Sequence, residues 1–431
     1  MASAVPGQPG DFEREATPDQ PVSATERLVA LDLIRGVAVL GILFANITDF
    51  GQPQAAYFWP EAIAGGPTAF DKLIWLFQLV VVDHKFRGLF SILFGAGVYL
   101  FTERAWARGS GRWLQFRRLL WLGVFGLVHY YLIWFGDILT AYAVTGIVAL
   151  AFLKLSARAQ LRWGLGLYGA GFLLMATLMG GNYLAANNPA VAARLTDEQR
   201  KELSAAPAKT LENATEDIAL YQNGSYPDIV RHTITERSDD LAQEVIFVPL
   251  SETLGLMLIG MALYRRGFFS GAFDPGMMRR WGWIGVIGGL AGTLPFALWP
   301  YLSGFPMITT IAVFNSFARI GQLPIALGLA ALLTVDANRL VATSLGSRFA
   351  AAGRMAFSNY LGTSFLMMFV FHGWALGLFA QLHRIELLLV VIAVWAGMLL
   401  WSKAWLARHR YGPLEWLWRC LTYWKLFPLR R

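Results

Sequence analysis

The sequence is poor in cysteine and in charged residues, and both shortages limit what the protein can be. Cys420 is the single cysteine in 431 residues, which excludes an internal disulfide and a metal cluster built from cysteines. Charged residues make up 15% of the chain, against about 25% in a typical soluble domain. The sequence also holds no phosphate-binding loop, no glycine-rich dinucleotide fingerprint and no histidine–glutamate metal spacing. We therefore expect no metal site and no covalently bound cofactor.

Apolar and aromatic residues are abundant instead. They raise the apolar share to 56% and the mean hydropathy to +0.47, and they include 17 tryptophans, which favour membrane interfaces. This composition predicts an all-α polytopic membrane protein. Residues 1–25 are polar, contain prolines and lack the apolar core of a signal peptide, so we expect a disordered tail there.

Apolar stretches define the predicted spans, because a helix needs roughly 20 apolar residues to cross the bilayer core. Ten such stretches are present: 33–50, 86–103, 117–135, 137–153, 163–181, 245–264, 281–301, 307–335, 355–376 and 385–403. An eleventh, 71–83, is too short for a comfortable span and is predicted to be an interfacial or re-entrant helix. The expected fold is thus a bundle of about ten transmembrane helices, or eleven if 71–83 crosses.

Basic residues in the short loops predict the orientation. With ten spans, the arginine- and lysine-rich loops fall on one side: 104–118, 154–162, 265–280 and 336–354. The C-terminal tail 404–431 is also basic, so both termini are predicted to be cytoplasmic. The net charge of +8 is therefore assigned to orientation, and we expect membrane lipid rather than nucleic acid as a partner. The polar stretch 182–241, within a transmembrane domain of residues 26–425, is predicted to form an ordered extracytoplasmic cap.

Polar residues inside spans are candidate functional residues, because ionisable groups in a bilayer are costly unless they are paired or hydrated. Asp32, Arg35 and Asn46 share one face of the first span, since they are three and eleven residues apart. Two interpretations remain open for this stripe. Either it binds a substrate, or Asp32 pairs with Arg35 at the interface while Asn46 bonds a neighbouring helix.

A second stripe lies in the 307–335 span, where Asn315, Arg319 and Gln322 share a face. Arg319 falls near the middle of the membrane and cannot lose its proton, so it needs an anion nearby. That anion is either a group on the substrate, such as a phosphate, or a carboxylate of the protein. Glu252 in the 245–264 span is the candidate internal partner.

Three further candidates lie toward the ends of spans. Arg354 and Asn359 belong to GRMAFSNYLGTS at the predicted cytoplasmic face, where they either bind substrate or make ordinary bonds at a helix start. His84 lies in VVVDHKFRGLF at the predicted outer boundary. It is either a base reachable from outside or one member of a charged boundary cluster.

The stretch VHYYLIWFGDILTAYAV carries His129 and Asp137 between two apolar runs. Its short turn predicts that the 117–135 and 137–153 spans form a tight antiparallel pair. Histidine can shuttle protons or attack acyl groups. Asp137 either fixes the tautomer of His129, as a carboxylate does in hydrolytic triads, or caps the start of the next helix.

Together these stretches resemble the YeiB-type family of bacterial inner-membrane proteins, the domain of unknown function 418. The resemblance covers the chain beyond residue 25 and rests on LDLIRGVAVLGILFANI, KFRGLFSILFGAG, GLVHYYLIWFGDILTAYA, GRMAFSNYLGTS and YGPLEWLWRCLTY. It implies a location in the bacterial inner membrane. More remotely, the chain is similar to transmembrane acyltransferases of the heparan-glucosaminide N-acetyltransferase and acyltransferase-3 groups. These pass an acyl group from cytoplasmic acyl-CoA to an acceptor, often a sugar.

The shared feature of those groups is Leu-Asp-x-x-Arg-Gly in the first span, with a polar residue eleven after the arginine. That residue is usually histidine in the acyltransferase-3 group and is Asn46 here. The glucosaminide group has asparagine there and its catalytic histidine just after the span, whereas this sequence has no histidine from 47 to 83. His129 or His84 is therefore the substitute histidine in the predicted enzyme.

The resemblance implies an acyltransferase with acyl-CoA as donor. The expected catalytic residues are His129, Asp137 and Asn46. The expected substrate-binding residues are Asp32, Arg35, Arg319, Asn315, Arg354, Asn359 and His84; among these, Arg35 and Arg354 would bind the CoA phosphates, while Arg319 would stabilise an oxyanion together with Asn46. A small-solute transporter or permease is the alternative, followed by a non-catalytic membrane partner or sensor. The oligomeric state is open, a homo-oligomer included.

Overall fold

The structure is a computed structural model that describes residues 28–109, 111–248 and 252–431. These residues are helical almost throughout, with no β-strand and one isolated bridge between His409 and Arg430. The prediction of an all-α fold is confirmed. The tail predicted for residues 1–25 lies outside the described residues.

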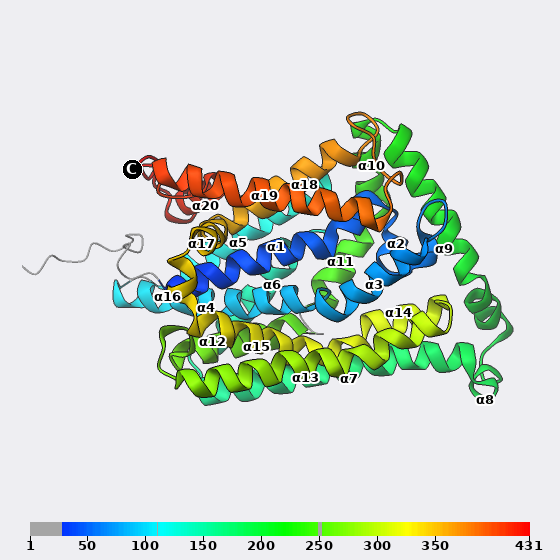
Figure 1. The fold of residues 1–431 in the computed structure, drawn as a ribbon, viewed down its shortest axis with the longest axis horizontal. Helices are drawn as coiled ribbons and strands as arrows, with labels where there is room; N and C mark the ends of the chain where they lie inside the picture. The colour runs from blue at the N-terminus through cyan, green and yellow to red at the C-terminus, as the bar shows by residue number, and fades with distance from the viewer. Residues whose placement is uncertain (1–27, 110, 249–251) are drawn as a thin grey trace, which may run out of the picture.

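Within the described residues, five segments are long and apolar enough to cross a membrane: α1 (Val29–Gly51), α7 (Ala157–Asn187), α13 (Pro275–Leu302), Met307–Val335 and α19 (Arg384–Arg408). Figure 1 shows α1, α7, α13 and α19 running along one common direction. Shorter apolar helices accompany them: α6 (Leu139–Ala149), α12 (Leu254–Arg265) and α18 (Ala356–Phe371). A membrane-type helical bundle is thus observed, while the number of ten crossings stays a prediction.

The bundle has two distinct ends (Figure 1). We call one the basic end, where α1 begins and where α16 (Ala337–Val341), α17 (Ser344–Arg354), α20 (Pro413–Tyr423) and the C-terminus lie. The opposite, cap end carries α2 (Gln54–Phe58), α8 (Pro189–Ala192), α9 (Asp197–Asn223) and α10 (Tyr226–Glu236). Because the described chain starts and finishes at the basic end, it traverses the bundle an even number of times.

The polar stretch 182–241 folds into helices, and α9 runs across the cap end of the long helices (Figure 1). Capping boxes begin its helices: Thr196 pairs with Gln199 in α9, and Ser225 pairs with Asp228 in α10. The hydroxyl and amide of Ser225 hold the pKa of Asp228 below its ordinary value. An ordered cap was expected here; the side of the membrane that it faces stays a prediction.

Among the residues that the structure describes, two passages through the bundle are broken near its middle. The first consists of α3 (Ala69–Val81) and α4 (Lys85–Ala107). Gln78 of α3 donates to the Ala45 carbonyl of α1 at 3.0 Å, while a methyl group added at Gly41 would lie 2.2 Å from the Phe86 ring of α4. The two helices therefore pass α1 in succession, joined at His84, whose φ is 65°. Residues 71–83, predicted as an interfacial or re-entrant helix, form the cap-side half of this broken passage.

The other break divides the predicted 307–335 span, which consists of α14 (Met307–Asn315), a 3-10 turn at Phe317–Gly321 and α15 (Gln322–Val335). The 245–264 span holds α11 (Ser238–Val248) and α12, with Glu252 just before α12, and residues 249–251 lie outside the described part of the chain. Such breaks are tolerated at membrane depth only where the freed backbone groups are bonded within the protein or face a cavity.

Between the breaks and the basic end, α4 and α12 pack with their backbones in contact. A methyl group at Gly95 would lie 2.0 Å from the Met257 carbonyl oxygen, and one at Gly260 would lie 1.9 Å from that of Ile92. Glycine is required at both positions because any side chain would force the helices apart. This close packing holds Glu252, just before α12, against the first turns of α4.

Candidate functional site

A cavity of about 920 Å³ lies inside the bundle and is lined by residues from both ends of it. The basic-end lining includes Arg35, Arg118, Arg354, Glu415 and Arg419. The middle contributes Asn46, His84, Arg87, Asn315 and Arg319, and the cap-end part includes Asp49, Gln54, Asp240 and Gln243. The volume falls within the roughly 300–1,000 Å³ typical of small-molecule sites. The molecule therefore contains a chamber along which polar groups are spaced from end to end.

The structure brings many of the predicted site residues to this chamber and leaves others outside. The residues that line it are Arg35, Asn46, His84, Asn315, Arg319 and Arg354. The residues outside its lining are Asp32, His129, Asp137 and Asn359.

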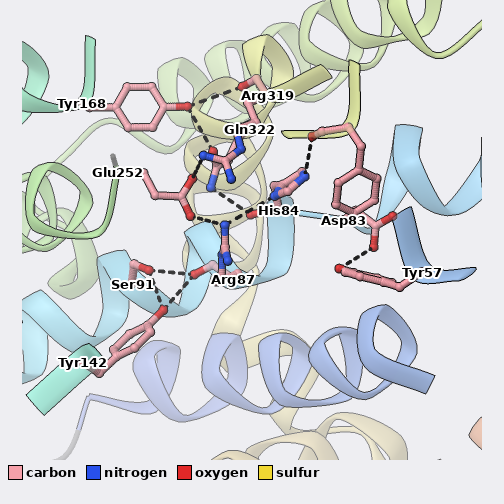
Figure 2. A network of polar contacts seen from close by, with 11 residues as sticks. Tyr57, Asp83, His84, Arg87, Ser91, Tyr142, Tyr168, Glu252, Arg319 and Gln322 are labelled. Atoms are coloured by element: carbon pink, nitrogen blue, oxygen red, sulfur yellow. Dashed lines mark hydrogen bonds and ion pairs between the residues drawn. The ribbon is translucent and has the colours of Figure 1, made fainter. Parts of the chain in front are cut away.

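Glu252 lies between two arginines beside the two breaks (Figure 2). Its carboxylate is 2.5 Å from the guanidinium of Arg87 and 3.5 Å from that of Arg319. The predicted pairing of Glu252 with Arg319 is confirmed, and Arg87 is a second partner that the sequence analysis did not name. Two positive charges and one negative charge leave the trio with one net positive charge beside the chamber.

His84 holds the two breaks together. Its Nε2 is 3.0 Å from the Phe314 carbonyl oxygen, and its Nδ1 is 3.4 Å from Arg87 Nη2. Because guanidinium only donates, Nδ1 accepts and Nε2 carries the proton. The His84 carbonyl in turn accepts from Gln322 Nε2 at 3.1 Å, so the broken helices satisfy one another's polar groups.

These bonds correct the expectation for His84. The residue is 6% exposed and lies at the break within the bundle, whereas the sequence placed it at the outer boundary. The charged Asp83–His84–Lys85 run suggested an end of the membrane, but Lys85 donates to the Leu79 carbonyl at 2.5 Å and Asp83 accepts from Gln78 at 3.2 Å. With both ring nitrogens engaged, His84 positions Arg87 and has no lone pair left for a substrate.

His129 and Asp137 meet as predicted, and Asp137 performs both of the proposed tasks. Its Oδ1 is 2.8 Å from His129 Nδ1, while its Oδ2 accepts from the amide of Thr140 at 2.9 Å and the hydroxyl at 3.0 Å. The pair joins α5 (Arg112–Leu132) to α6. His129 is 0% exposed. Trp134 and Tyr360 line the chamber, and their ring centroids lie 6.1 and 5.3 Å from the ring centroid of His129. Its catalytic role stays a prediction.

Asn359 is occupied by contacts between helices. Its amide donates to the Ala352 carbonyl at 3.0 Å and to Ser402 Oγ at 3.1 Å, and its oxygen accepts from Trp401 Nε1 at 2.9 Å. These bonds join α18 to α19, so its position does not favour the predicted substrate contact. Asp32 accepts from Arg35 at 3.2 Å, which confirms the predicted pair, and Arg35 still reaches the chamber.

At its basic end the chamber is lined in part by α20, which the sequence analysis did not connect to the site. Glu415 accepts from the amides of Phe357 and Ser358, at 2.8 and 3.0 Å, and so fastens α20 to the start of α18. Trp418 packs on Arg118, whose guanidinium is 4.3 Å from its ring centroid. Four arginines line this end with a single lining glutamate (Arg35, Arg118, Arg354, Arg419 and Glu415), which gives it an excess of positive charge.

Asp49 is the other site residue that the sequence analysis missed. It lies three residues after Asn46 and shares its helix face, so the signal was readable. Arg87 was present in the quoted KFRGLF stretch, but nothing in the sequence alone showed that the helix breaks before it.

Comparisons with known proteins assign the family. A family model described as "Protein of unknown function (DUF418)" matches residues 263–425. The chain is 34% identical over 411 residues to "Uncharacterized protein YeiB" of Escherichia coli (strain K12), a match covering 92% of this chain and 96% of YeiB. The chain belongs to the YeiB-like DUF418 family. It is also 28% identical over 445 residues to "Uncharacterized protein YxaH" of Bacillus subtilis (strain 168), covering 96% and 98% of the two chains. No solved structure matches the chain.

The DUF418 match does not contain the whole site. It includes Arg319, Arg354, Glu415 and the rest of α20, whereas Arg35, Asn46, Arg87 and Glu252 precede it. The match to YeiB covers 92% of this chain. YeiB and YxaH are both described as uncharacterized, so the function proposed below rests on the chemistry of the chamber.

Proposed function

We propose that the protein is a membrane acyltransferase of the bacterial inner membrane, with acyl-CoA bound at the basic end and the acceptor at the cap end. The supporting observation is the chamber itself, which joins an arginine-rich mouth to a buried, net-positive trio and then to a polar cap end. Guanidinium groups pair well with phosphates, so Arg35, Arg118 and Arg354 suit the phosphates of CoA. The basic end is cytoplasmic in this proposal, in agreement with the basic loops.

The middle of the chamber suits the acyl carbonyl. Attack on a thioester places negative charge on the carbonyl oxygen, and donors fixed in a water-poor site stabilise that charge. Arg319, Arg87 and Asn46 line this region and are the proposed donors. Removing one such donor typically lowers the rate about 10²–10³-fold. A catalytic role for His129 would require the rings of Trp134 and Tyr360 to move aside.

The test uses purified full-length protein and acetyl-CoA. We expect it to bind CoA and to release CoA from acetyl-CoA. Arg35→Gln and Arg118→Gln should each weaken CoA binding about tenfold or more, because a hydrogen bond to a charged group contributes about 1.5–3 kcal/mol. Arg158→Gln is the matched control, since Arg158 is exposed and does not line the chamber. Absence of CoA binding and of acetyl-CoA turnover would refute the proposal.

A small-solute transporter is the second candidate, favoured by one observation. Discontinuous helices whose broken ends meet in mid-membrane commonly form substrate sites in transporters, and the breaks after α3 and α14 lie beside Glu252 and Arg319 here. Proteoliposomes separate the two functions. Solute flux without CoA release supports transport, whereas CoA release with the acyl group recovered in a product supports the enzyme.

A further inference from the structure

Asp49 is a carboxylate that lines the chamber and has an oxygen without a partner. Its Oδ1 is buried with no hydrogen-bond partner among the described residues. Asp71 accepts from Thr68, His383 and the Arg384 amide, Asp137 is bonded to His129 and Thr140, and Glu252 forms ion pairs with Arg87 and Arg319. Buried polar atoms are almost always bonded, so a carboxylate that lines a cavity and is not fully bonded by the protein is a candidate for a ligand contact.

The nearby cation of the cap is already engaged. Arg237 donates to both carboxylate oxygens of Asp217, at 3.1 and 3.2 Å, and to Gln54 Oε1 at 3.1 Å, and its guanidinium lies 4.0 Å from the Phe135 ring centroid. Burial alone would lower the pKa of Arg237, but Tyr221 and Asp217 raise it above its ordinary value, so it stays charged.

Arg237 therefore has its ion pair with Asp217. Asp49, Asp240 and Gln243 line the same end of the chamber, so the cap end carries acidic side chains where the basic end carries arginines. A carboxylate only accepts hydrogen bonds, so an acceptor group that reaches Asp49 has to be a hydrogen-bond donor.

We propose that Asp49 is the general base that accepts the proton of the acceptor nucleophile, a neutral hydroxyl or amine. This inference rests on the proposed acyltransferase function. Asp49 takes the proton as the acceptor oxygen or nitrogen forms a bond to the thioester carbonyl carbon. The carbon–sulfur bond then breaks, and CoA leaves as a thiolate that takes a proton from water at the basic end. Asp49 returns its proton to water at the cap end, so the step is balanced.

The position of Asp49 fits this role. It follows Asn46, a proposed oxyanion donor, by three residues on the same helix face. The base and the donor therefore line the same stretch of the chamber and are held by one rigid helix. General base catalysis typically contributes about 10²–10⁴-fold to a rate.

The test compares two nucleophiles with acetyl-CoA as donor, after subtraction of rates without protein. Hydroxylamine attacks thioesters without help from a base, whereas water needs one. We expect Asp49→Asn to lower acetyl-CoA hydrolysis about 10²-fold or more while hydroxamate formation changes less than about threefold. Asp49→Glu should recover part of the hydrolysis. Asp239→Asn is the control, because Asp239 is exposed on the same face of the fold and does not line the chamber.

Unchanged hydrolysis in Asp49→Asn would overturn the inference, and so would an equal loss of both products, which indicates a structural role. Wild-type protein that forms neither product overturns the proposed function and this inference with it.

Discussion

Replacing Glu252 with glutamine tests whether one carboxylate stabilises the two broken passages. Glu252 is 2% exposed and lies 2.5 Å from Arg87 and 3.5 Å from Arg319. Removal of one member of a buried ion pair costs about 3–5 kcal/mol, because the remaining charge is left uncompensated. Here two guanidiniums would remain, so the local net charge would rise from +1 to +2. We expect the melting temperature to fall on the order of 5–10 °C.

The assay follows the reaction of Cys420 with a thiol-reactive dye during heating. Cys420 is the single cysteine and is 7% exposed, so its labelling reports unfolding. Arg319→Gln should cost less than Glu252→Gln, since Glu252 keeps the closer Arg87. The double variant should cost less than the sum of the two, because removal of Arg319 relieves the repulsion. The trio does not stabilise the breaks if Glu252→Gln has the same melting temperature as the exposed-site control Asp239→Asn. The same conclusion follows if the destabilisation of the double variant equals the sum of the two single variants.

Three other substitutions probe the packing and the site. Gly95→Ala should destabilise by about 1–3 kcal/mol, since its methyl group would lie 2.0 Å from the Met257 carbonyl, whereas Gly97→Ala on the same helix has open space and should not; equal melting temperatures would contradict the close packing. Asn359→Ala should cost about 1–3 kcal/mol by leaving Trp401 and Ser402 without an acceptor and donor, with unchanged CoA affinity in a binding titration. His129→Ala should lower stability by about 1–3 kcal/mol because Asp137 loses its partner at 2.8 Å; a loss of turnover at an unchanged melting temperature would instead support the catalytic prediction for His129.

Much of the fold was predictable because a membrane helix can be recognised in the sequence by its long apolar stretch. The span 33–50 falls within α1, 281–301 within α13 and 385–403 within α19. The antiparallel pair around His129 and Asp137 was also predictable, since the turn between them is too short for any other arrangement.

The breaks were not predictable from hydropathy. The 307–335 stretch is apolar throughout apart from its polar stripe, and nothing in its periodicity marks the 3-10 turn at Phe317–Gly321. Asp83, His84 and Lys85 looked like the end of a span, because a charge run is read as an interface unless its partners are known. Those partners, Gln78, Leu79 and Phe314, come from a neighbouring helix turn or from a segment more than 200 residues away in the sequence.

The site was predicted in part for the same reason. Stripes of polar residues on one helix, such as Asp32–Arg35–Asn46, follow from residue spacing. The pairing of Glu252 with Arg319 followed from their opposite charges. Arg118, Glu415 and Arg419 reach the chamber only because α20 folds back against α5 and α18, and tertiary contacts of this kind leave no periodic signal. Asn359 shows the opposite error. It was predicted to contact a substrate, but its hydrogen bonds are made to residues of neighbouring helices.

The most direct test of the account is a structure of the protein with S-ethyl-CoA, a thioether that cannot transfer its ethyl group. The account predicts density inside the chamber, with the phosphates at Arg35, Arg118, Arg354 and Arg419 and the ethyl group near Asn46 and Arg319. An empty chamber at a saturating concentration, or the analogue bound elsewhere on the bundle, would contradict it.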